Sequence, residues 1–193
     1  MASVVSICNT ALSHIGKATI SDINEQSEEA NQCKLHYGLT RDTMLQGFNW
    51  QFANRKLVLA EVANPWPERW ERAYTRPTDC LKPIRIIPEV DPRMSTDEIP
   101  YEAGEGLIFT SQSAAKLEYT RLIDDPARFP PLFLDALCWA LATKICLPLT
   151  KDQSLRKDAF QIAAQTLNAA QVSDANEQQD SYDYPSTFIR ARG

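Results

Sequence analysis

The residues best suited to acid–base or metal chemistry are few and widely spaced. His14 and His36 are the only histidines. Both fall in stretches of helical periodicity, without a carboxylate or thiol at the spacing of a metal site. Glu25, Glu28 and Glu29 lie close together, but they stand where a helix begins, and acidic side chains there complement the helix dipole. We therefore expect surface or hydrogen-bonded histidines and solvated acids rather than a catalytic group.

The cysteines also fail to form a chemical motif. They are five in number, without a C-x-x-C pair, and four of them fall on or beside the apolar faces of expected helices. Buried thiols of this kind behave as small hydrophobic side chains. We expect neither disulfides nor a zinc site among Cys8, Cys33, Cys80, Cys138 and Cys146.

Short motifs of known enzymes are missing. The chain contains no G-x-S-x-G, no P-loop and no H-E-x-x-H. Gly104-Glu105-Gly106 is followed by a strand pattern, whereas a phosphate-binding loop needs a helix N-terminus at that point. A hairpin turn is the simpler interpretation. The sequence thus predicts a protein that is not an enzyme and has no cofactor or metal.

Composition and charge limit the possible partners. The chain has 193 residues, of which 44% are apolar and 23% charged, a balance typical of a globular domain with a substantial core. Its net charge of −5 argues against free DNA as a ligand, because duplex binding relies on cationic side chains. We see no secretory leader and no apolar run near the roughly 20 residues of a membrane span. We expect a cytosolic protein with no membrane partner.

Two helices are expected near the N-terminus. The first covers Val4 to Ile15 and ends at Gly16. The second is long and amphipathic, is capped by Ser27 and ends near Gly47. Its buried face should carry Ala30, Cys33, Tyr37, Met44 and Phe48.

Two further helices are expected after Asp124-Asp125, which resemble turn residues before Pro126. The third helix should begin at Pro131 and be stopped by Pro148. Thr150 with Gln153 resembles a capping box for the fourth helix. The apolar stripe of that helix should be Phe160, Ala163, Leu167 and Ala170.

The segment between the two helical pairs has a β pattern. Seven prolines between Trp50 and Ile123 exclude long helices there. A clean alternation from Ala114 to Ile123 is typical of a strand with two different faces. Ala103 to Gly106 fits a hairpin turn. The strand-like runs cover residues 52–62, 70–75, 81–87, 99–102, 107–110 and 114–123.

These patterns predict an α+β fold. A discontinuous four-helix domain would comprise residues 1–49 and 125–177, with a small antiparallel β lobe inserted at residues 50–124. An extended C-terminal arm, residues 178–193, would follow. Four aromatic residues could form the core of the β lobe or, alternatively, an exposed recognition surface. They are Trp50, Phe52, Trp66 and Trp70.

The C-terminal arm is rich in side chains that anchor interfaces. A disordered terminus is normally depleted in aromatic residues, so we interpret this segment as a docking arm rather than a loose end. Its expected anchors are Tyr182, Tyr184, Phe188, Ile189, Arg190 and Arg192.

Several of these patterns together resemble a known family. The N-terminal helix reads V-x-x-I-C-N-x-A-L-x-x-I-G from Val4. It is followed by Trp-x-Phe-Ala-x-Arg at residues 50–55, Pro-x-Asp-Cys-Leu at 77–81, Phe-Pro-Pro-Leu-Phe at 129–133 and Ala-Asn-Glu-Gln at 175–178. Their order and spacing are similar to those of the head-to-tail adaptors of short-tailed bacteriophages, the tail tubular protein A-like or gateway proteins. The resemblance covers nearly the whole chain.

The resemblance implies a structural role in the neck or tail of the virion, after assembly in the host cytoplasm. Such adaptors form a ring of twelve subunits beneath the portal, and the genome passes through it during ejection. It implies that the helical domain faces the portal and the β lobe faces the tail nozzle. The arm would then bind the portal or a neighbouring subunit. The nozzle side would include Glu102, Gly104, Glu105 and Gly106. The acidic wall would let DNA pass without specific binding.

Other functions remain open from the sequence. Another neck component, such as a head-completion or tail-terminator ring protein, fits the same patterns. A virion-associated wall hydrolase would need a pair of acids in a cleft, for which the sequence offers no clear candidate. A small DNA-packaging or regulatory protein would need a basic recognition face, which none of the expected helices shows.

Overall fold

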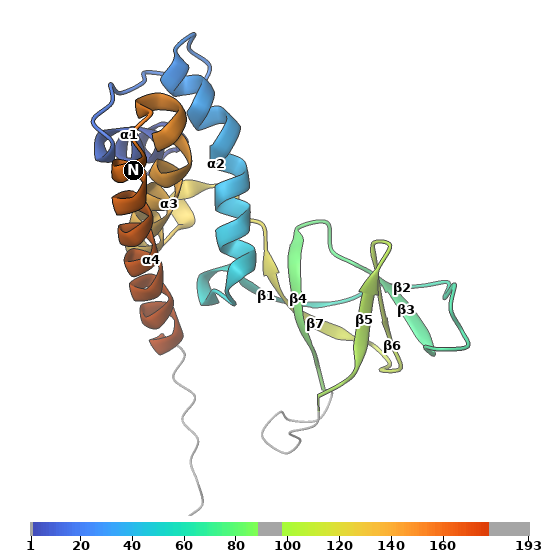
Figure 1. Cartoon of the computed structure of the whole chain (residues 1–193). Helices are drawn as coiled ribbons and strands as arrows, with labels where there is room; N and C mark the ends of the chain where they lie inside the picture. Colours follow the sequence, from blue (N-terminus) through green and yellow to red (C-terminus); the bar gives the residue numbers. More distant parts are fainter. Residues whose placement is uncertain (1, 89–97, 178–193) are drawn as a thin grey trace, which may run out of the picture.

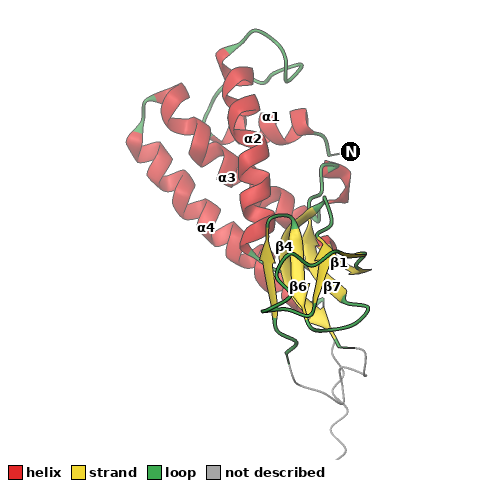
Figure 2. Cartoon of the chain, turned by 90° about the vertical axis from the view of Figure 1, so that its right-hand side faces the viewer, coloured by secondary structure: helices red, strands yellow, loops and turns green. Residues whose placement is uncertain are grey.

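The computed structural model describes residues 2–88 and 98–177. These residues form four α-helices and two antiparallel sheets, an α+β fold as expected. The helices gather on one side of the molecule and the strands on the other, beside the lower end of α2 (Figure 1). After a quarter turn the strands lie in front of the lower ends of the helices (Figure 2). We call the two regions the helical part and the β part.

The glycine after the first helix and the cap of the second helix are those that the sequence predicts, whereas the cap of the first helix was not predicted. Helix α1 (Val4–His14) begins with a reciprocal pair of hydrogen bonds between Ser3 and Ser6, and Gly16 follows it with a φ of +67°. Helix α2 (Glu28–Gly47) is capped by the Ser27 side chain, which accepts from the Ala30 N–H. The loop between the helices is fastened by Asn9, whose amide both donates to and accepts from the backbone of Ile20.

Helix α3 (Pro131–Thr150) begins at the expected proline, but the expectation that Pro148 stops it is wrong. Pro148 lies in the last turn, where its missing N–H removes only one hydrogen bond. That turn is held instead by the Lys151 N–H, which donates to the Leu147 carbonyl, and by the Thr150 hydroxyl, which donates to Cys146. Lys151 then ends the helix in the left-handed conformation, with a φ of 57°.

The sequence predicted Thr150 as the cap of helix α4 (Gln153–Asn176), and this prediction is wrong. The cap is Asp152, whose carboxylate accepts from the N–H groups of Ser154 and Leu155. The expected stripe is wrong at its first position, because Phe160 is 64% exposed. The buried residues of this helix are Ala159, Ala170 and Asp174.

Helix α3 is the centre of the helical part. It packs against α1, α2 and α4, and its core-facing residues include Phe133, Leu137 and Leu141. By length and composition alone α3 could span a membrane. The expectation that no apolar run approaches the length of a membrane span is therefore wrong. A core helix meets the same criterion, and the partners that surround α3 explain its apolar character.

The β part consists of two antiparallel sheets around a shared small core. One sheet has the order β1-β7-β4 and the other β2-β3-β6-β5. The core between them includes Leu59, Tyr74, Ile108 and Leu117. The strands are β1 (Asn54–Val58), β2 (Glu61–Val62), β3 (Arg72–Thr75), β4 (Cys80–Ile87), β5 (Tyr101–Gly104), β6 (Leu107–Thr110) and β7 (Lys116–Arg121).

The first expected strand, residues 52–62, is divided. Its first residues form a 3₁₀ turn, η1 (Gln51–Ala53), and the rest splits into β1 and β2 on either side of Leu59. Leu59 is 6% exposed because the chain passes from one sheet to the other there and turns this side chain into the shared core. The other expected runs correspond to β3 through β7, with shifted ends.

Candidate interaction surfaces and the joint between the two parts

The aromatic residues at the start of the β segment belong to the helical core. Trp50 is 1% exposed, and its indole N–H donates to the Met44 carbonyl of α2 over 2.8 Å. Its ring lies 4.9 Å from that of Phe133, and the Phe52 ring lies 5.0 Å from the same side chain. The expectation that Trp50 and Phe52 pack in the core of the β lobe is therefore wrong. They form a joint between the two parts, residues 48–55, on the helical side.

The end of α4 also fastens the joint. The Gln51 N–H donates to the Asp174 carboxylate over 2.7 Å, although the two residues are far apart in the sequence. Asp174 is only 6% exposed. Burial raises the pKa of this carboxyl, and the hydrogen bonds that it accepts from the joint backbone oppose the rise. The joint is thus held by α2, α3 and α4 together.

A second connection returns the chain from β7 to the helices. Arg41 on α2, whose side chain is 13% exposed, forms an ion pair of 2.8 Å with Asp124. The Leu122 N–H donates to the Asp79 carbonyl over 2.7 Å. Asp125 caps the short 3₁₀ turn η2 (Pro126–Arg128), so its expected turn role is confirmed, whereas Asp124 serves in the ion pair with Arg41.

On the β side of the joint, Asp79 organises a polar cluster. Its two carboxylate oxygens accept from Arg55 and from the Tyr119 hydroxyl, each over 2.9 Å. Burial and the hydrogen bond to Asp79 raise the pKa of Tyr119 to about 12. Arg76 adds hydrogen bonds to the carbonyls of Cys80 and Leu81. This cluster orients the start of β4 against β1 and β7.

The face of the three-stranded sheet opposite the shared core carries a second buried acid, Glu118. Glu118 is 6% exposed and accepts from Asn54 on β1 over 2.7 Å and from Arg85 on β4 over 2.6 Å. Lys56 lies 3.8 Å away. Burial alone would raise the pKa of Glu118, but these donors and positive charges outweigh it, so the pKa is lowered.

The expected hairpin is confirmed between β5 and β6. Glu105 and Gly106 have φ values of 52° and 76°, as a tight two-residue turn requires. The Arg76 N–H donates to the Gly106 carbonyl over 3.0 Å and ties the turn to the end of β3. Gly104 precedes the turn as the last residue of β5, and it has open space where a side chain would stand.

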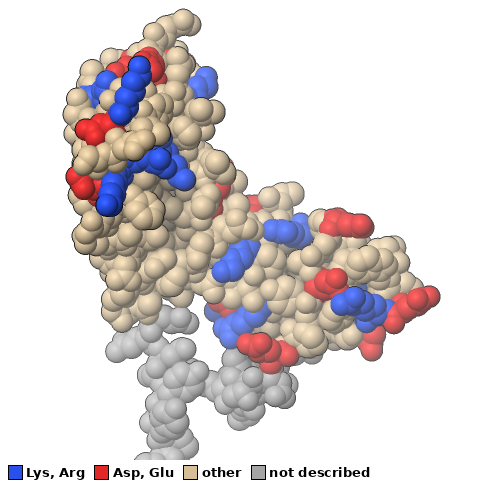
Figure 3. Space-filling model, in the orientation of Figure 1, with Lys and Arg blue, Asp and Glu red and all other residues tan. Residues whose placement is uncertain are grey.

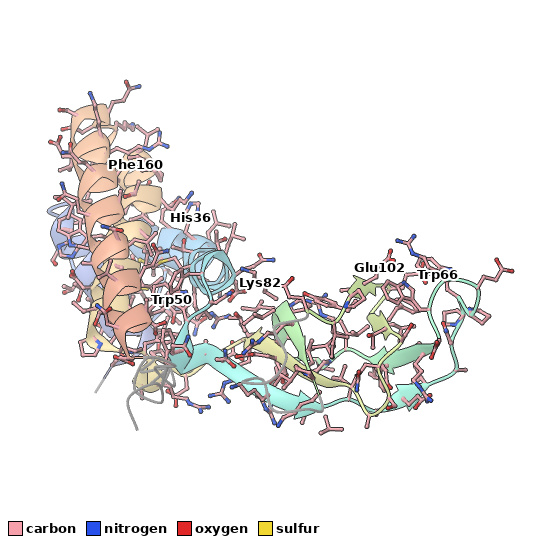
Figure 4. The ribbon with its side chains drawn as sticks, turned by 90° about the horizontal axis from the view of Figure 1, so that it is seen from below. His36, Trp50, Trp66, Lys82, Glu102 and Phe160 are labelled. Carbon is pink, nitrogen blue, oxygen red and sulfur yellow. The ribbon has the colours of Figure 1, made fainter. Side chains whose placement is uncertain are left out.

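Glu102, the remaining residue of the expected nozzle side, holds the loop between β2 and β3 in place. One of its carboxylate oxygens accepts from the Trp70 indole and pairs with Arg69, each over 3.1 Å. Trp66 stacks on the buried Phe109 ring at 5.1 Å and remains 43% exposed. Glu102 and Trp66 are neighbours at the end of the β part farthest from the helices (Figure 4). We use the term distal aromatic surface for the five residues Trp66, Arg69, Trp70, Glu102 and Phe109.

The distal aromatic surface combines features of both alternatives that the sequence left open, core packing of the β lobe and an exposed recognition surface. Trp66 covers Phe109 with one face of its ring, yet its exposure leaves it available for contact. Pro65 and Pro67 flank it around a shallow depression. The alternation of proline and tryptophan was a usable signal, whereas the roles of Arg69 and Phe109 depend on tertiary pairing that no local pattern shows.

The histidines have structural surroundings. The His14 ring stacks on Trp139 at 3.7 Å, and burial lowers its pKa. His36 is partly exposed on α2 (Figure 4). Within residues 2–88 and 98–177, no three acidic, histidine or cysteine side chains are close enough to hold a metal ion. Glu25 accepts from the Ser21 N–H and the Ser27 hydroxyl, and these bonds lower its pKa.

All five cysteines are free and buried, as expected. Burial raises the pKa of Cys138 to about 11 and that of Cys80 above its usual range. Thiols with raised pKa values are poor nucleophiles at neutral pH. Cys80 and Cys138 therefore serve as packing.

The expected anchors of the C-terminal arm, Tyr182 to Arg192, lie outside the described residues. The structure reveals another set of exposed apolar residues that the sequence analysis did not identify. Leu35 and Leu39 on α2 are 67% and 71% exposed. On α4, Phe160 is 64% exposed and Val172 is 55% exposed. On the face shown in Figure 3, the helical part carries interspersed acidic and basic residues.

Comparison with known proteins gives no assignment. No protein-family model matches the chain, and no curated protein matches it significantly.

Proposed function

We propose that this chain is a structural virion protein of a short-tailed bacteriophage, the head-to-tail adaptor that forms a ring between the portal and the tail nozzle. The helical part, with the arm of residues 178–193, would face the portal. The β part, with Glu102 and the turn of Gly104, Glu105 and Gly106, would face the nozzle. The finer arrangement, a discontinuous helical domain with an inserted β lobe, is part of the same proposal.

One observation carries the proposal beyond the sequence resemblance itself. Three of the motifs on which the resemblance rests meet at the joint. Trp50 and Phe52 of the first motif contact Phe133 of the Phe-Pro-Pro-Leu-Phe motif. Arg55 of the first motif pairs with Asp79 of the Pro-x-Asp-Cys-Leu motif. Motifs from three separate stretches of the chain thus form one structural unit, and this supports the proposal that they belong to one architecture.

The joint also supports a linking role. Apolar packing and hydrogen bonds fix the β part at one end of the helical part, and the distal aromatic surface stands at the opposite end of the β part. A molecule of this form offers two separated ends to two different partners. The net charge of −5 supports passage of DNA without binding.

The test is to mix the full chain with the portal ring of its own particle and to count the rotational symmetry of any added layer by electron microscopy. A twelve-fold layer at the narrow end is the expected result. A layer of another symmetry would favour a different neck component, and absence of a layer would overturn the proposal. Removal of residues 180–193 should weaken attachment to the portal and leave the fold intact.

A mobility-shift assay tests the passage of DNA separately. We expect no appreciable binding of duplex DNA at physiological salt, because phosphates meet a net negative protein. Tight binding would contradict a passive channel.

A further inference from the structure

Strand β1 has one open edge. In the part of the chain that the structure describes, β1 pairs with β7 on one side and with no strand on the other. Four of its five residues are exposed, among them Leu57 at 36% and Val58 at 60%. Its two charges do not protect the edge, because Arg55 and Lys56 each lie within ion-pair distance of a carboxylate in the β part. Open edges with apolar side chains readily add a further strand, so proteins normally cover them.

The backbone groups on the open edge can be assigned. The Leu59 N–H donates to the Ala115 carbonyl over 2.9 Å, which continues the antiparallel register of β1 with β7. In such a pair, residues that bond across the ladder alternate with residues whose N–H and C=O groups point outward. Leu57 therefore bonds to β7, whereas the N–H and C=O groups of Lys56 and Val58 point away from it. These two residues offer donors and acceptors to another strand.

The described residues end beside this edge. The last turn of α4 lies against η1, where the Asp174 carboxylate accepts from the Gln51 N–H over 2.7 Å. Strand β1 begins at Asn54, directly after η1. The arm of residues 178–193 follows α4 and therefore starts close to the first residue of β1. An extended chain advances about 3.3 Å per residue, so a few residues of the arm reach the strand and a further stretch as long as β1 can follow it.

The first half of the arm has the composition of such a strand. Residues 180–184 equal β1 in length, and tyrosine is among the residues most favoured in strands. Tyr182 and Tyr184 flank Asp183, so in a strand the two tyrosines would share one face and Asp183 would lie on the other. Pro185 follows, and proline ends a ladder because it has no N–H. The sequence thus bounds a candidate strand at residues 180–184.

Both faces of β1 complement this segment. Lys56 and Val58 share a face of the sheet with Lys116, the residue opposite Val58 on β7. Lys116 is exposed and has no ion pair among the described residues, so Asp183 on this side would meet a positive face. The two tyrosines would then lie beside Leu57 and cover the apolar surface that β1 exposes on the other face.

We propose that residues 180–184 bind the open edge of β1 in their own chain, as an additional strand parallel to β1. The direction follows from the joint, because the arm and β1 both leave the molecule's helical side there. The attachment through α4 keeps the segment at a high effective concentration beside its own edge, so a second copy is not needed. The inference concerns the isolated chain and does not depend on the proposed function. Under that function, residues 186–192 remain for the portal.

The test is amide hydrogen exchange, measured residue by residue with NMR, in the full chain and in a chain that ends at residue 178. We expect the Lys56 and Val58 amides to exchange about tenfold more slowly in the full chain, because only there does the arm accept from their N–H groups. The Leu57 amide is the internal control, since it bonds to β7 in both chains and should change little.

Equal exchange of Lys56 and Val58 in the two chains would overturn the proposal. Slow exchange in both would mean that another segment covers the edge, and fast exchange in both would mean that the edge stays open.

Two full-length variants locate the segment. Tyr182→Pro places a residue without an N–H at the centre of residues 180–184 and should abolish the protection of Lys56 and Val58. Ile189→Pro is the matched control, because it makes the same kind of change in the other half of the arm and should leave the protection unchanged. Loss of protection in both variants, or in neither, would overturn the assignment to residues 180–184. Circular dichroism checks that the truncated chain and both variants keep their helices.

Dilution distinguishes the arm of the same chain from the arm of a second copy. Protection within one chain should be unchanged on about tenfold dilution, whereas an arm exchanged between copies would lose it, and such a loss would overturn the proposal.

The portal experiment remains independent of this test. A twelve-fold layer formed by a chain whose β1 edge is unprotected would leave the adaptor function standing and the inference wrong. A protected edge without any layer on the portal would leave the inference standing and the adaptor function wrong.

Discussion

The helical part and the β part bury their interiors by different means. In the described chain the helical core contains 25 buried apolar residues, whereas the core between the sheets contains eight. The β part compensates with buried polar groups: Glu118 collects donors from two neighbouring strands, and Asp79 collects a guanidinium and a phenol. Apolar burial is insensitive to pH, but ionised side chains are not. The two parts should therefore respond differently to acid and to substitution.

The largest expected effect is in the helical core at the joint. Phe133→Ala removes the ring that contacts Trp50, Phe52 and Phe129, and should cost about 3 to 5 kcal/mol of unfolding free energy. Denaturant titration measures this cost. Leu132→Ala is the control, because that neighbour is 46% exposed and should change stability by less than about 1 kcal/mol. Equal costs for the two variants would contradict the packing of the joint.

The next effect separates the parts by pH. Because the pKa of Glu118 is lowered on folding, its contribution is present above its unfolded pKa near 4.5 and is lost as pH falls through the folded value. Glu118→Ala should cost roughly 2 kcal/mol near neutral pH, since it leaves Asn54 and Arg85 without their acceptor. Amide exchange at decreasing pH should show the β part opening before the helical part.

Glu118→Gln refines that experiment. The amide keeps an acceptor for Asn54 but cannot ionise, so the variant should lose most of the acid dependence of the β part. An unchanged acid profile would place the pH sensitivity elsewhere.

A smaller effect is expected at Asp79. Asp79→Asn removes the charge that pairs with Arg55 and weakens the hydrogen bond from Tyr119, at a cost of about 1 to 1.5 kcal/mol. The pKa of Tyr119, about 12 in the native chain, should fall toward the ordinary value of a phenol, though burial still holds it above. Alkaline NMR titration of the Tyr119 ring measures this shift, and a value that does not fall would contradict the hydrogen bond.

The smallest expected effect on stability is at the distal aromatic surface. Trp66→Ala uncovers Phe109 and should cost about 0.5 to 1.5 kcal/mol, whereas Trp66→Phe should recover most of it. If the surface binds the nozzle, the alanine variant should lose nozzle attachment far more than it loses stability. Pull-down of the nozzle protein with both variants separates the two effects.

The sequence predicted best what depends on local chemistry. The Ser27 cap, Pro131 at a helix start and the hairpin at Glu105 and Gly106 follow from short-range rules and are confirmed. It failed where neighbouring residues offer competing local signals. The last turn of α3 accommodates Pro148, and Asp152 displaces Thr150 as the cap of α4.

The candidate surfaces were predicted less well, for a physical reason. Trp50 and Trp66 have the same side chain and both lie outside the expected strand runs. Trp50 is nevertheless buried among helices, whereas Trp66 stacks on one side chain of a sheet and stays partly exposed. Their difference depends on partners distant in sequence, such as Phe133 and Phe109. The exposure of Phe160 likewise depends on which side of α4 faces α3, which a stripe of four residues did not determine.

The chain passes between the two parts twice, and this has a mechanical consequence. The outgoing pass is anchored by Trp50 and by the bond from Gln51 to Asp174, and the return pass by the ion pair of Arg41 with Asp124. A load applied to the β part is shared by two covalent tethers side by side, so neither peptide segment alone acts as a swivel. The two parts should tilt or twist as one lever, and a single break in the backbone of either tether would leave them joined.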